Sequence, residues 1–313
     1  MNILVVGGSG LIGAHVVTVL RERGHTVSTV ARTARPGVDH VLDVGSASIG
    51  ELRPLLAGHD GVVYATRTDE QQPLPKPIYP VFRRDIVEPV VRLFTAARQE
   101  GLTRGVLMGS YYTYHDRLHP QWRLADRHTY IRCRLEQARE GRVAAGPELP
   151  VAVLELPFIL GRAGDRLPNW AGPLDRWARS RAPLAVPVGG TAAASARSVA
   201  DVAVDALERA SGADIPVADE NLTWHDMIAR TAEAVGLPRR VRRLPAGTVR
   251  AFLRLGGLLA ALGRKESGLD ATHFADLLLA ELFIEPTSGR SLDPAFHDTF
   301  PDTGSVETSA ARS

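Results

Sequence analysis

The sequence predicts an α/β fold, a doubly wound parallel sheet followed by a smaller, mostly helical C-terminal lobe. Two observations indicate this. From residue 1 to residue 157, short runs of β-branched residues alternate with longer amphipathic stretches, the pattern of a parallel sheet flanked by helices. After residue 157 the pattern becomes mostly helical. We therefore expect domains at 1–157 and 158–301, and a frayed tail of small and polar residues at 302–313.

The expected elements of the first domain are short apolar runs and the helical patterns between them. The strands are Ile3–Val6, Thr26–Val30, His40–Leu42, Gly61–Tyr64, Gly105–Met108 and Val151–Leu154. The helices are Leu11–Arg23, Ile49–Ala57, Val81–Glu100 and Arg127–Ala144. Gly24 directly follows the first helix, where a glycine commonly ends one.

The expected elements of the second domain are five helices and two short strands. The helices are Leu174–Arg181, Val199–Ala210, Trp224–Val235, Ala246–Leu262 and Ala271–Leu282. The strands are Leu184–Val188 and Ile215–Val217. The most apolar stretch, residues 253–262, is too short to cross a bilayer and contains Arg254.

Composition narrows the class of protein. The net charge is +2, and the arginines are scattered along the chain, so no nucleic-acid partner is expected. No membrane partner is expected either, because no apolar stretch is long enough to span a bilayer. Cys133 is the single cysteine, which excludes an intramolecular disulfide and fits a reducing compartment. The chain runs straight from Met1 into a strand pattern without the features of a signal peptide, so we expect a cytoplasmic protein.

A glycine-rich loop joins the first expected strand to the first expected helix. Residues 5–13 read VVGGSGLIG, which contains G-x-G-x-x-G at Gly8, Gly10 and Gly13, and a further glycine at Gly7. Glycines there permit a tight turn, close approach of a pyrophosphate to backbone N–H groups, and close packing of helix on strand. The pyrophosphate then lies at the positive end of the helix that begins with Leu11 and Ile12. The loop therefore predicts a dinucleotide-binding, Rossmann-type sheet.

The residues after the second expected strand favour NADP(H) over NAD(H). An acidic residue there binds the ribose hydroxyls of NAD, whereas an arginine accommodates a 2′-phosphate. Here Arg32 occupies the position, with Thr33 and Arg35 as further phosphate contacts, and no acid occurs before Asp39. The alternative is that Arg32 is a solvated loop residue. Asp43, after the third strand, is a candidate adenine contact.

Five further segments follow the glycine loop in a recognisable order. They are Val106–Tyr114, Tyr130–Arg134, Leu156–Gly161, Arg197–Ala203 and Leu222–Met227. Together with the glycine loop they resemble the extended or atypical short-chain dehydrogenase/reductase superfamily, which includes NAD(P)-dependent epimerases, dehydratases and reductases. The resemblance covers most of the chain. It implies that Pro157 and Phe158 lie beside the nicotinamide and that residues 158–301 form a substrate lobe.

The same resemblance implies the catalytic residues. Tyr130 would be the general acid or base at the substrate oxygen, and Ser110 would hydrogen-bond that oxygen. The lysine of the family's Y-x-x-x-K pair is replaced by Arg134 here. An arginine keeps a permanent positive charge one helical turn from the tyrosine, but it cannot release a proton, so a proton relay through it is blocked. Retained activity and loss of catalysis are therefore both open. The helix that carries Tyr130 often forms dimer interfaces in such proteins, so a homodimer is one option.

The substrate residues are expected in apolar segments around these positions. The loop after Ser110 and the loop after the sixth strand supply Tyr112, His115, Trp122, Phe158 and Trp170 as candidates. His115 and His119 are four residues apart, but the loop setting and Pro120 argue against a metal site. Each aromatic residue is also explained as ordinary core. Tyr114 or His115 is the alternative acid if Tyr130 is misplaced.

Three functions are compatible with these observations. The first is an NADP(H)-dependent reductase of a small organic or secondary-metabolite-like carbonyl compound, or the reverse alcohol oxidation, a ketoreductase activity. The second is an epimerase or dehydratase that uses its cofactor transiently. The third is a cofactor-binding regulator that has lost catalysis with its lysine. A sugar nucleotide is disfavoured because such family members tend to carry Asn where this chain has Phe158.

Overall fold

Seven strands form one sheet in the order β11-β7-β6-β4-β1-β2-β3. The computed structural model describes residues 1–66, 74–262 and 265–302. The strands are β1 (Asn2–Val6), β2 (Thr26–Ala31), β3 (His40–Val41), β4 (Gly61–Tyr64), β6 (Arg104–Met108), β7 (Val151–Glu155) and β11 (Asp214–Pro216). Every neighbouring pair is parallel. The doubly wound α/β fold predicted from the sequence is confirmed, and its strands match within one or two residues.

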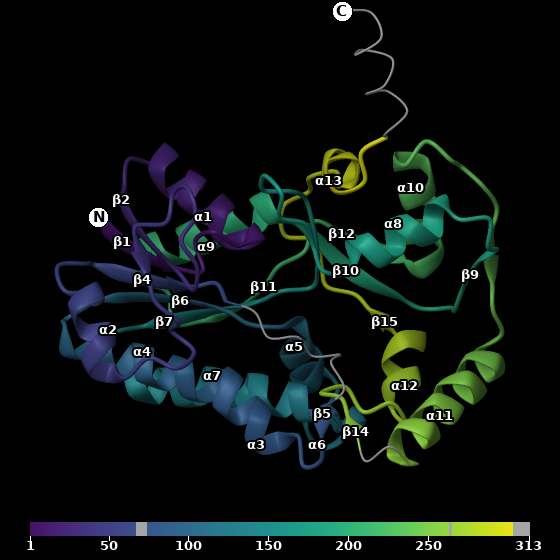
Figure 1. The fold of residues 1–313 in the computed structure, drawn as a ribbon, viewed down its shortest axis with the longest axis horizontal. Helices are drawn as coiled ribbons and strands as arrows, with labels where there is room; N and C mark the ends of the chain where they lie inside the picture. Colours follow the sequence, from purple (N-terminus) through teal and green to yellow (C-terminus); the bar gives the residue numbers. More distant parts are fainter. Residues whose placement is uncertain (67–73, 263–264, 303–313) are drawn as a thin grey trace, which may run out of the picture.

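Helices cover both faces of this sheet (Figure 1). One face carries α1 (Leu11–Glu22) and α9 (Ala196–Glu208), and the other carries α2 (Ile49–Leu56), α4 (Glu88–Gln99) and α7 (Thr129–Ala145). Two buried clusters lie between helices and sheet. One joins apolar residues of β1 to α1 and α9, and the other joins the opposite face to α2 and α4. Because the sheet is buried on both faces, its central strands are almost continuously apolar.

One long helix expected at Val81–Glu100 is interrupted. The chain forms α3 (Tyr79–Phe82), then a π-helical turn at Arg83–Val87, and then α4. Pro89 in the first turn of α4 has no N–H to donate, so the regular backbone ladder cannot continue through this point. The backbone N–H of Glu88 instead bonds the carbonyl of Arg83. π-Turns of this kind are frequent near functional sites.

The C-terminal lobe combines small sheets with helices. A four-stranded sheet contains β8 (Phe158–Leu160), β10 (Gly190–Ser195), β12 (Glu220–Thr223) and β15 (Glu281–Leu282). Two further pairs are β9 (Leu184–Val186) with β13 (Val241–Arg243), and β5 (Leu74–Pro75) with β14 (Lys265–Glu266). The helices are α8 (Ala171–Arg179), α10 (Trp224–Ala234), α11 (Ala246–Leu262), α12 (Phe274–Leu279) and α13 (Asp293–Thr299).

The helix expected at Ala271–Leu282 is shorter than predicted. It begins at Phe274 and ends at Leu279, and β15 follows it. The Asp270 side chain accepts hydrogen bonds from the backbone N–H groups of Thr272 and His273, which folds residues 270–273 into a turn. The other predicted helices of this lobe are present with shifted ends, and α11 has the predicted bounds.

The expected boundary at residue 157/158 does not separate the two parts cleanly. The strand expected at Ile215–Val217 is β11, and it extends the N-terminal sheet beside β7 instead of lying in the smaller lobe. Helix α9 likewise packs on α1. Strand periodicity alone carries no information about which sheet a short strand joins. The tail expected to fray at 302–313 lies outside the described residues except for Asp302.

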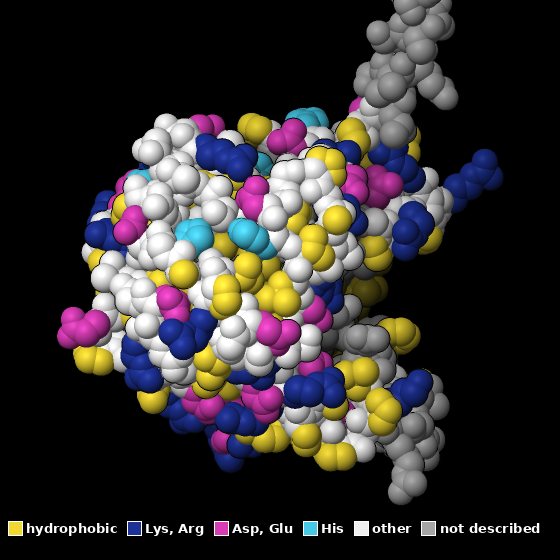
Figure 2. Space-filling model, turned by 60° about the vertical axis from the view of Figure 1, so that its left-hand side comes forward, with side chains coloured by type: hydrophobic (Ala, Val, Ile, Leu, Met, Phe, Trp, Pro, Cys, Tyr) yellow, Lys and Arg dark blue, Asp and Glu magenta, His cyan; other side chains and the backbone are white. Residues whose placement is uncertain are grey.

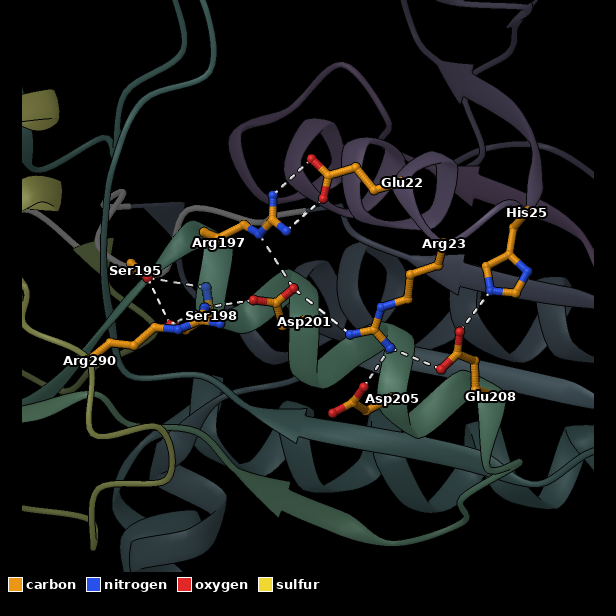
Figure 3. A network of polar contacts seen from close by, with 10 residues as sticks. All are labelled: Glu22, Arg23, His25, Ser195, Arg197, Ser198, Asp201, Asp205, Glu208 and Arg290. Carbon is orange, nitrogen blue, oxygen red and sulfur yellow. Dashed lines mark hydrogen bonds and ion pairs between the residues drawn. The ribbon is translucent and has the colours of Figure 1, made fainter.

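Charged side chains hold α9 against α1 (Figure 3). Arg23, at the end of α1, contacts Asp205 at 2.6 Å and Glu208 at 2.9 Å. Arg197 pairs with Glu22 through both guanidinium Nη atoms, the shorter contact being 2.6 Å. These residues include part of the Arg197–Ala203 segment noted in the sequence. That segment therefore anchors the helix that begins at the glycine loop.

The segment after Ser110 was expected as a loop and is helical. It forms α5 (Tyr111–Leu118), a 3₁₀ turn at Pro120–Trp122 and α6 (Leu124–Arg127). Ser110 caps α5, its side chain accepting from the backbone N–H of Tyr112 at 3.5 Å. Serine is a favoured residue at this position of a helix because its hydroxyl accepts from a backbone N–H that has no partner within the helix. Across the described residues, we find no helix with the length and apolar character to cross a membrane.

Candidate active site

A cavity of about 1670 Å³ lies between the carboxyl ends of the N-terminal strands and residues of the C-terminal lobe. Its lining includes residues that follow β1, β2, β4, β6 and β7, together with residues of α12 and of the segment after β8. Open α/β sheets bind ligands at this edge. The volume exceeds the roughly 300–1,000 Å³ of a typical single-ligand pocket. The cavity therefore has room for a dinucleotide and a second molecule side by side.

The glycine loop forms one end of the cavity, and its backbone leaves no room for side chains. Gly7 has a φ of +85° and its carbonyl accepts from the N–H of Gly10 at 2.9 Å. A Cβ at Gly13 would lie 2.1 Å from the Gly7 carbonyl oxygen, and one at Gly7 would lie 2.6 Å from the Ala65 carbonyl oxygen. Gly7, Gly10, Leu11 and Ile12 line the cavity, while Gly13 packs against the loop from the helix side.

The residues expected around the adenosine end lie together at the rim. Arg32, Thr33, Arg35 and Asp43 all line the cavity. Arg35 also reaches across to the segment after β8, where its guanidinium lies 3.6 Å from the Asp165 carboxylate. The rim is thus basic on the β2 side, where the sequence predicted a phosphate contact.

Asp39, the first acid after β2, is turned away from this rim. Its carboxylate accepts from the backbone N–H of Thr29 at 2.8 Å and from the Thr29 hydroxyl at 2.9 Å. These hydrogen bonds hold the pKa of Asp39 below its usual range. The carboxylate therefore fixes the β2–β3 connection and is not among the residues that line the cavity.

Tyr130 and Arg134 are both buried, and both line the cavity. Arg134 Nε donates to Tyr130 Oη at 3.0 Å, and the guanidinium carbon lies 5.1 Å from the tyrosine ring centroid. The spacing of four residues on α7 brings the two side chains together. The sequence-based pairing of these two residues thus corresponds to a direct contact.

Gln137 holds Arg134 and was not identified from the sequence. Its Oε1 accepts from Arg134 Nη1 at 2.9 Å, and its Nε2 donates to the carbonyl of Ile86 at 2.8 Å. Ile86 lies in the π-helical turn. The available signal was the spacing of Tyr130, Arg134 and Gln137, which places all three on one side of a helix. A chain of hydrogen bonds therefore runs from the π-turn through α7 to the Tyr130 hydroxyl.

The start of α7 is attached to the segment that precedes α12. The Tyr130 backbone N–H donates to the Gly268 carbonyl at 2.9 Å. The Asp270 N–H donates to His128 Nδ1 at 3.0 Å, and burial lowers the pKa of His128 to about 4, so the imidazole is neutral. The C-terminal lobe thus fixes the position of the tyrosine.

Ser110 and the tyrosines near it form the wall on the β6 side. Ser110, Tyr111 and Tyr112 line the cavity, and the rings of Tyr112 and Tyr130 meet edge to face at 6.4 Å. The Tyr111 hydroxyl accepts from Thr191 Oγ1 at 3.1 Å. Tyr64, at the end of β4, also lines the cavity, and burial raises its pKa. No motif in the sequence singles out Tyr64 as a functional residue.

The wall formed by the C-terminal lobe is apolar and aromatic. Phe158 lies 5.4 Å from Trp170 and 5.6 Å from Trp224, measured between ring centroids. Trp224 Nε1 donates to the Leu278 carbonyl at 2.7 Å, which ties this aromatic group to α12. Further lining residues are Pro157, Ile159, Leu167, Pro173, Phe274, Leu277 and Leu282. Among the described residues beyond 157 that line the cavity, Arg166 alone is charged.

His115 and Trp122 do not line this cavity. His115 is on α5 and Trp122 is in the 3₁₀ turn that follows it, and His115 stacks with His119 and Trp122 at centroid distances of 6.3 and 6.5 Å. His115 is only 1% exposed, and burial lowers its pKa to about 4. Of the five residues expected to contact substrate, the structure thus gathers Tyr112, Phe158 and Trp170. In residues 1–66, 74–262 and 265–302, no three His, Cys, Asp or Glu side chains are grouped as metal ligands.

Comparison with known proteins relates this geometry to a family. Residues 7–143 match the family described as NAD(P)H-binding. No curated protein sequence matches the chain. A nucleoside-diphosphate-sugar epimerase from Pseudomonas aeruginosa is 21% identical in structural alignment, with a TM-score of 0.68 and coverage of 96% of each chain.

Two further solved structures have the same fold. A human epimerase family protein with NADPH is 16% identical, with a TM-score of 0.64 over 96% of this chain and 99% of that one. The protein gox2253 is 17% identical, with a TM-score of 0.75 over 95% of this chain and 96% of that one. Residues 7–143 are therefore similar to NAD(P)H-binding domains, and the chain shares its fold with these solved structures, several of which are epimerases.

Proposed function

We propose that the protein is an NADP(H)-dependent oxidoreductase that reduces the carbonyl group of a small organic compound, or oxidises the corresponding alcohol. The observation that carries the proposal is the Tyr130 hydroxyl, which receives a hydrogen bond from Arg134 inside the cavity at 3.0 Å. In this proposal the sheet domain with the Ser110 and Tyr130 segments holds the cofactor, and residues after 157 supply most of the substrate wall.

The residues at the glycine-loop end fit a dinucleotide. The tight contacts at Gly7 and Gly13 leave bare backbone where a pyrophosphate would approach the start of α1. Arg32, with Arg35 and Thr33 beside it, would bind a 2′-phosphate, and Asp39 is not available to bind a ribose in its place. Asp43 would contact the adenine end. Bound NADPH would supply hydride, and Pro157 and Phe158 would lie at its reactive end.

Tyr130 would give the proton to the carbonyl oxygen, and Ser110 would orient that oxygen. Arg134 can only donate hydrogen bonds, so the tyrosine's own hydrogen is not used in their contact and is free to point at the substrate. When the proton has left, the fixed charge of Arg134 stabilises the phenolate. The arginine thus replaces the electrostatic part of a lysine's role, and proton return comes from water.

The apolar wall supports a substrate without a large charged group. A nucleotide sugar brings a diphosphate that needs basic partners in the substrate lobe, and Arg166 alone is charged among the described lining residues there. The aromatic group of Phe158, Trp170 and Trp224 instead suits a flat or alicyclic ketone.

The test is substitution of the acid. Tyr130→Phe keeps the ring but removes the hydroxyl, so we expect kcat for carbonyl reduction to fall by roughly 10²–10⁴-fold with NADPH binding retained. NADPH oxidation at its absorbance band, measured over a panel of ketones, reports the rate. Tyr114→Phe is the matched control, since Tyr114 is on α5 and does not line the cavity. Full activity in Tyr130→Phe would refute this assignment.

The cofactor preference has its own test. Arg32→Ala should weaken NADPH binding by roughly 10-fold or more and leave NADH binding nearly unchanged. The reason is that Arg32 would contact the 2′-phosphate, which NADPH carries and NADH lacks. Calorimetric titration with both cofactors measures this. Arg209→Ala, an exposed arginine at the end of α9, is the control. Equal losses for the two cofactors would remove the basis for NADP(H).

An epimerase or dehydratase reaction is the second candidate, favoured by the epimerases among proteins of the same fold. The same residues would then act in a cycle that returns the cofactor unchanged. Product formation without net NADPH consumption would distinguish it. NADPH binding with no turnover of any kind, and no gain in Arg134→Lys, would indicate a regulator instead.

A further inference from the structure

The charge of the chain is unevenly distributed along its length. From Ala234 to Lys265 there are eight basic residues and no Asp or Glu, in a chain whose net charge is +2. They are Arg239, Arg240, Arg242, Arg243, Arg250, Arg254, Arg264 and Lys265. The stretch forms β13 and α11. The overall composition conceals this local excess.

Four of these arginines are exposed and lack an acidic partner among the described residues. Arg239 is occupied with the carbonyls of residues 177, 178 and 182, and Arg250 pairs with Asp276 at 3.3 Å. Arg240, Arg242, Arg243 and Arg254 are exposed and form no ion pair within the described parts of the chain. Figure 2 shows Lys and Arg side chains projecting from the right-hand edge of the molecule.

Helix α11 also presents large apolar side chains to solvent. It lies at the lower right of Figure 1, where it packs on α12 and β14. Val249 is buried on the packed side, but Phe252 is 75% exposed and Leu255 is 58% exposed. Phe252 is the most exposed large hydrophobic side chain in the described part of the chain. This exposed aromatic and leucine pair flanks Arg254 on α11, and α11 directly follows the unpaired arginines of β13, a combination that is unusual for a surface that meets only water.

We propose that β13 and α11, the β13–α11 surface, bind the headgroup region of an anionic phospholipid membrane. The arginines are attracted to the negative surface, and Phe252 and Leu255 enter the boundary with the acyl chains, as in helices that lie in the membrane interface. The surface rests on the membrane and does not cross it. This proposal revises the expectation from composition that no membrane takes part.

Charge selects this partner over a second copy of the chain. Two copies docked through this surface would bring two sets of unpaired arginines together, which is repulsive. A nucleic acid would satisfy the arginines but would leave Phe252 and Leu255 without an apolar environment. An anionic bilayer satisfies both. Since α11 packs on α12, whose residues line the cavity, a bound membrane would lie next to the apolar wall.

Vesicle binding of the full chain tests the proposal. We expect the protein to float with vesicles of phosphatidylcholine and phosphatidylserine, not with phosphatidylcholine alone, and to be released by added salt. Arg240→Gln, Arg242→Gln and Arg243→Gln combined should weaken binding on the order of 100-fold, from about fivefold for each arginine. Phe252→Ser with Leu255→Ser should abolish flotation.

Two control variants distinguish a specific loss of vesicle binding from loss of the fold and from binding to another partner. Val143→Ser with Leu118→Ser removes two other exposed apolar side chains, and Arg53→Gln, Arg139→Gln and Arg209→Gln removes three other exposed charges. Both should bind vesicles as the unmodified protein does. Unchanged NADPH affinity in every variant reports an intact fold. Absence of flotation, binding that ignores phosphatidylserine, or self-association that Phe252→Ser abolishes without vesicle binding would each overturn the proposal.

Discussion

At the scale of single residues, the arginine in place of a lysine determines how the site can work. A lysine ammonium rotates freely, whereas the planar guanidinium of Arg134 must be held in one orientation to keep Nε on Tyr130. Gln137 and the Met108 carbonyl, at 2.9 and 3.4 Å, supply that orientation. Arg134 and the buried Gln137 therefore form one hydrogen-bonded group with Tyr130, which a search for Y-x-x-x-K alone overlooks.

Replacing Gln137 should reveal this dependence. Gln137→Leu removes the contact with Arg134 and the hydrogen bond to the Ile86 carbonyl, so we expect roughly 10-fold lower kcat and about 1–3 kcal/mol less stability. In an Arg134→Lys background, the same change should have little further effect on kcat, because a lysine does not need the orientation. Steady-state kinetics of the four proteins forms the double-mutant cycle.

An exposed glutamine provides the control for Gln137→Leu. Gln99→Leu changes an exposed glutamine at the end of α4 and should leave kcat unaltered. If Gln137→Leu lowers kcat equally in the unmodified protein and in the Arg134→Lys background, then Gln137 does not act by orienting Arg134. Its effect on kcat would then come only from the stability of the fold.

At the scale of elements, the turn between β1 and α1 has the least tolerance for change. Gly13→Ala would place a methyl group 2.1 Å from the Gly7 carbonyl oxygen, so loop and helix must separate. Such overpacking costs roughly 1–3 kcal/mol, and we expect NADPH affinity to fall by roughly 10-fold. Thermal unfolding with and without NADPH measures both effects. Gly247→Ala meets no atom within 4 Å and should change neither.

The elements also show what could be predicted from sequence and why. The central strands and their helices were predicted within a few residues because burial on both sides makes their patterns regular. The interruption of α3 and α4 was not, because a π-turn and an ordinary helix turn share nearly the same apolar spacing. The sheet that β11 joins was not predicted either, because the sequence of a three-residue strand does not indicate which strand it pairs with.

The candidate site likewise contains some residues that the sequence could identify and others that it could not. The glycine loop, Ser110, Tyr130 and Arg134 belong to local motifs, and the structure gathers the three side chains around one cavity. Trp224 and the α12 residues reach the same cavity from distant sequence, so only tertiary packing could identify them. His115 was misplaced because the segment after Ser110 was expected to be a loop, whereas α5 rotates it away.

At the scale of the whole molecule, buried histidines link stability to pH. Burial lowers the pKa of His115 and His128 to about 4, whereas each returns to about 6.5 in the unfolded chain. The unfolded chain therefore takes up more protons as pH falls through this window, and the folded state loses stability from about pH 6.5 down to about pH 4.

Denaturant unfolding at pH 7 and pH 5 measures the effect. Each histidine should contribute about 2 kcal/mol to the loss between these two values. In His115→Phe, which retains a ring for stacking, the loss should be smaller by about that amount. His40→Asn, at an exposed position of β3, should behave as the unmodified protein. An unchanged pH dependence in His115→Phe would show that His115 is protonated in the folded state.

The pairing of β5 with β14 has a consequence for chemical modification. The chain has two lysines, and this ladder brings them to one corner: Lys265 pairs with Pro75, next to Lys76, and Lys76 lies 3.4 Å from Glu266. Amine-directed labels and cross-linkers can therefore attach along the chain only there, apart from the N-terminus. The residues that line the cavity include Arg134 but no lysine, so such reagents do not modify its lysine-free wall. A reagent that reacts with guanidinium, such as a dicarbonyl, would be one way to modify the arginines of the cavity.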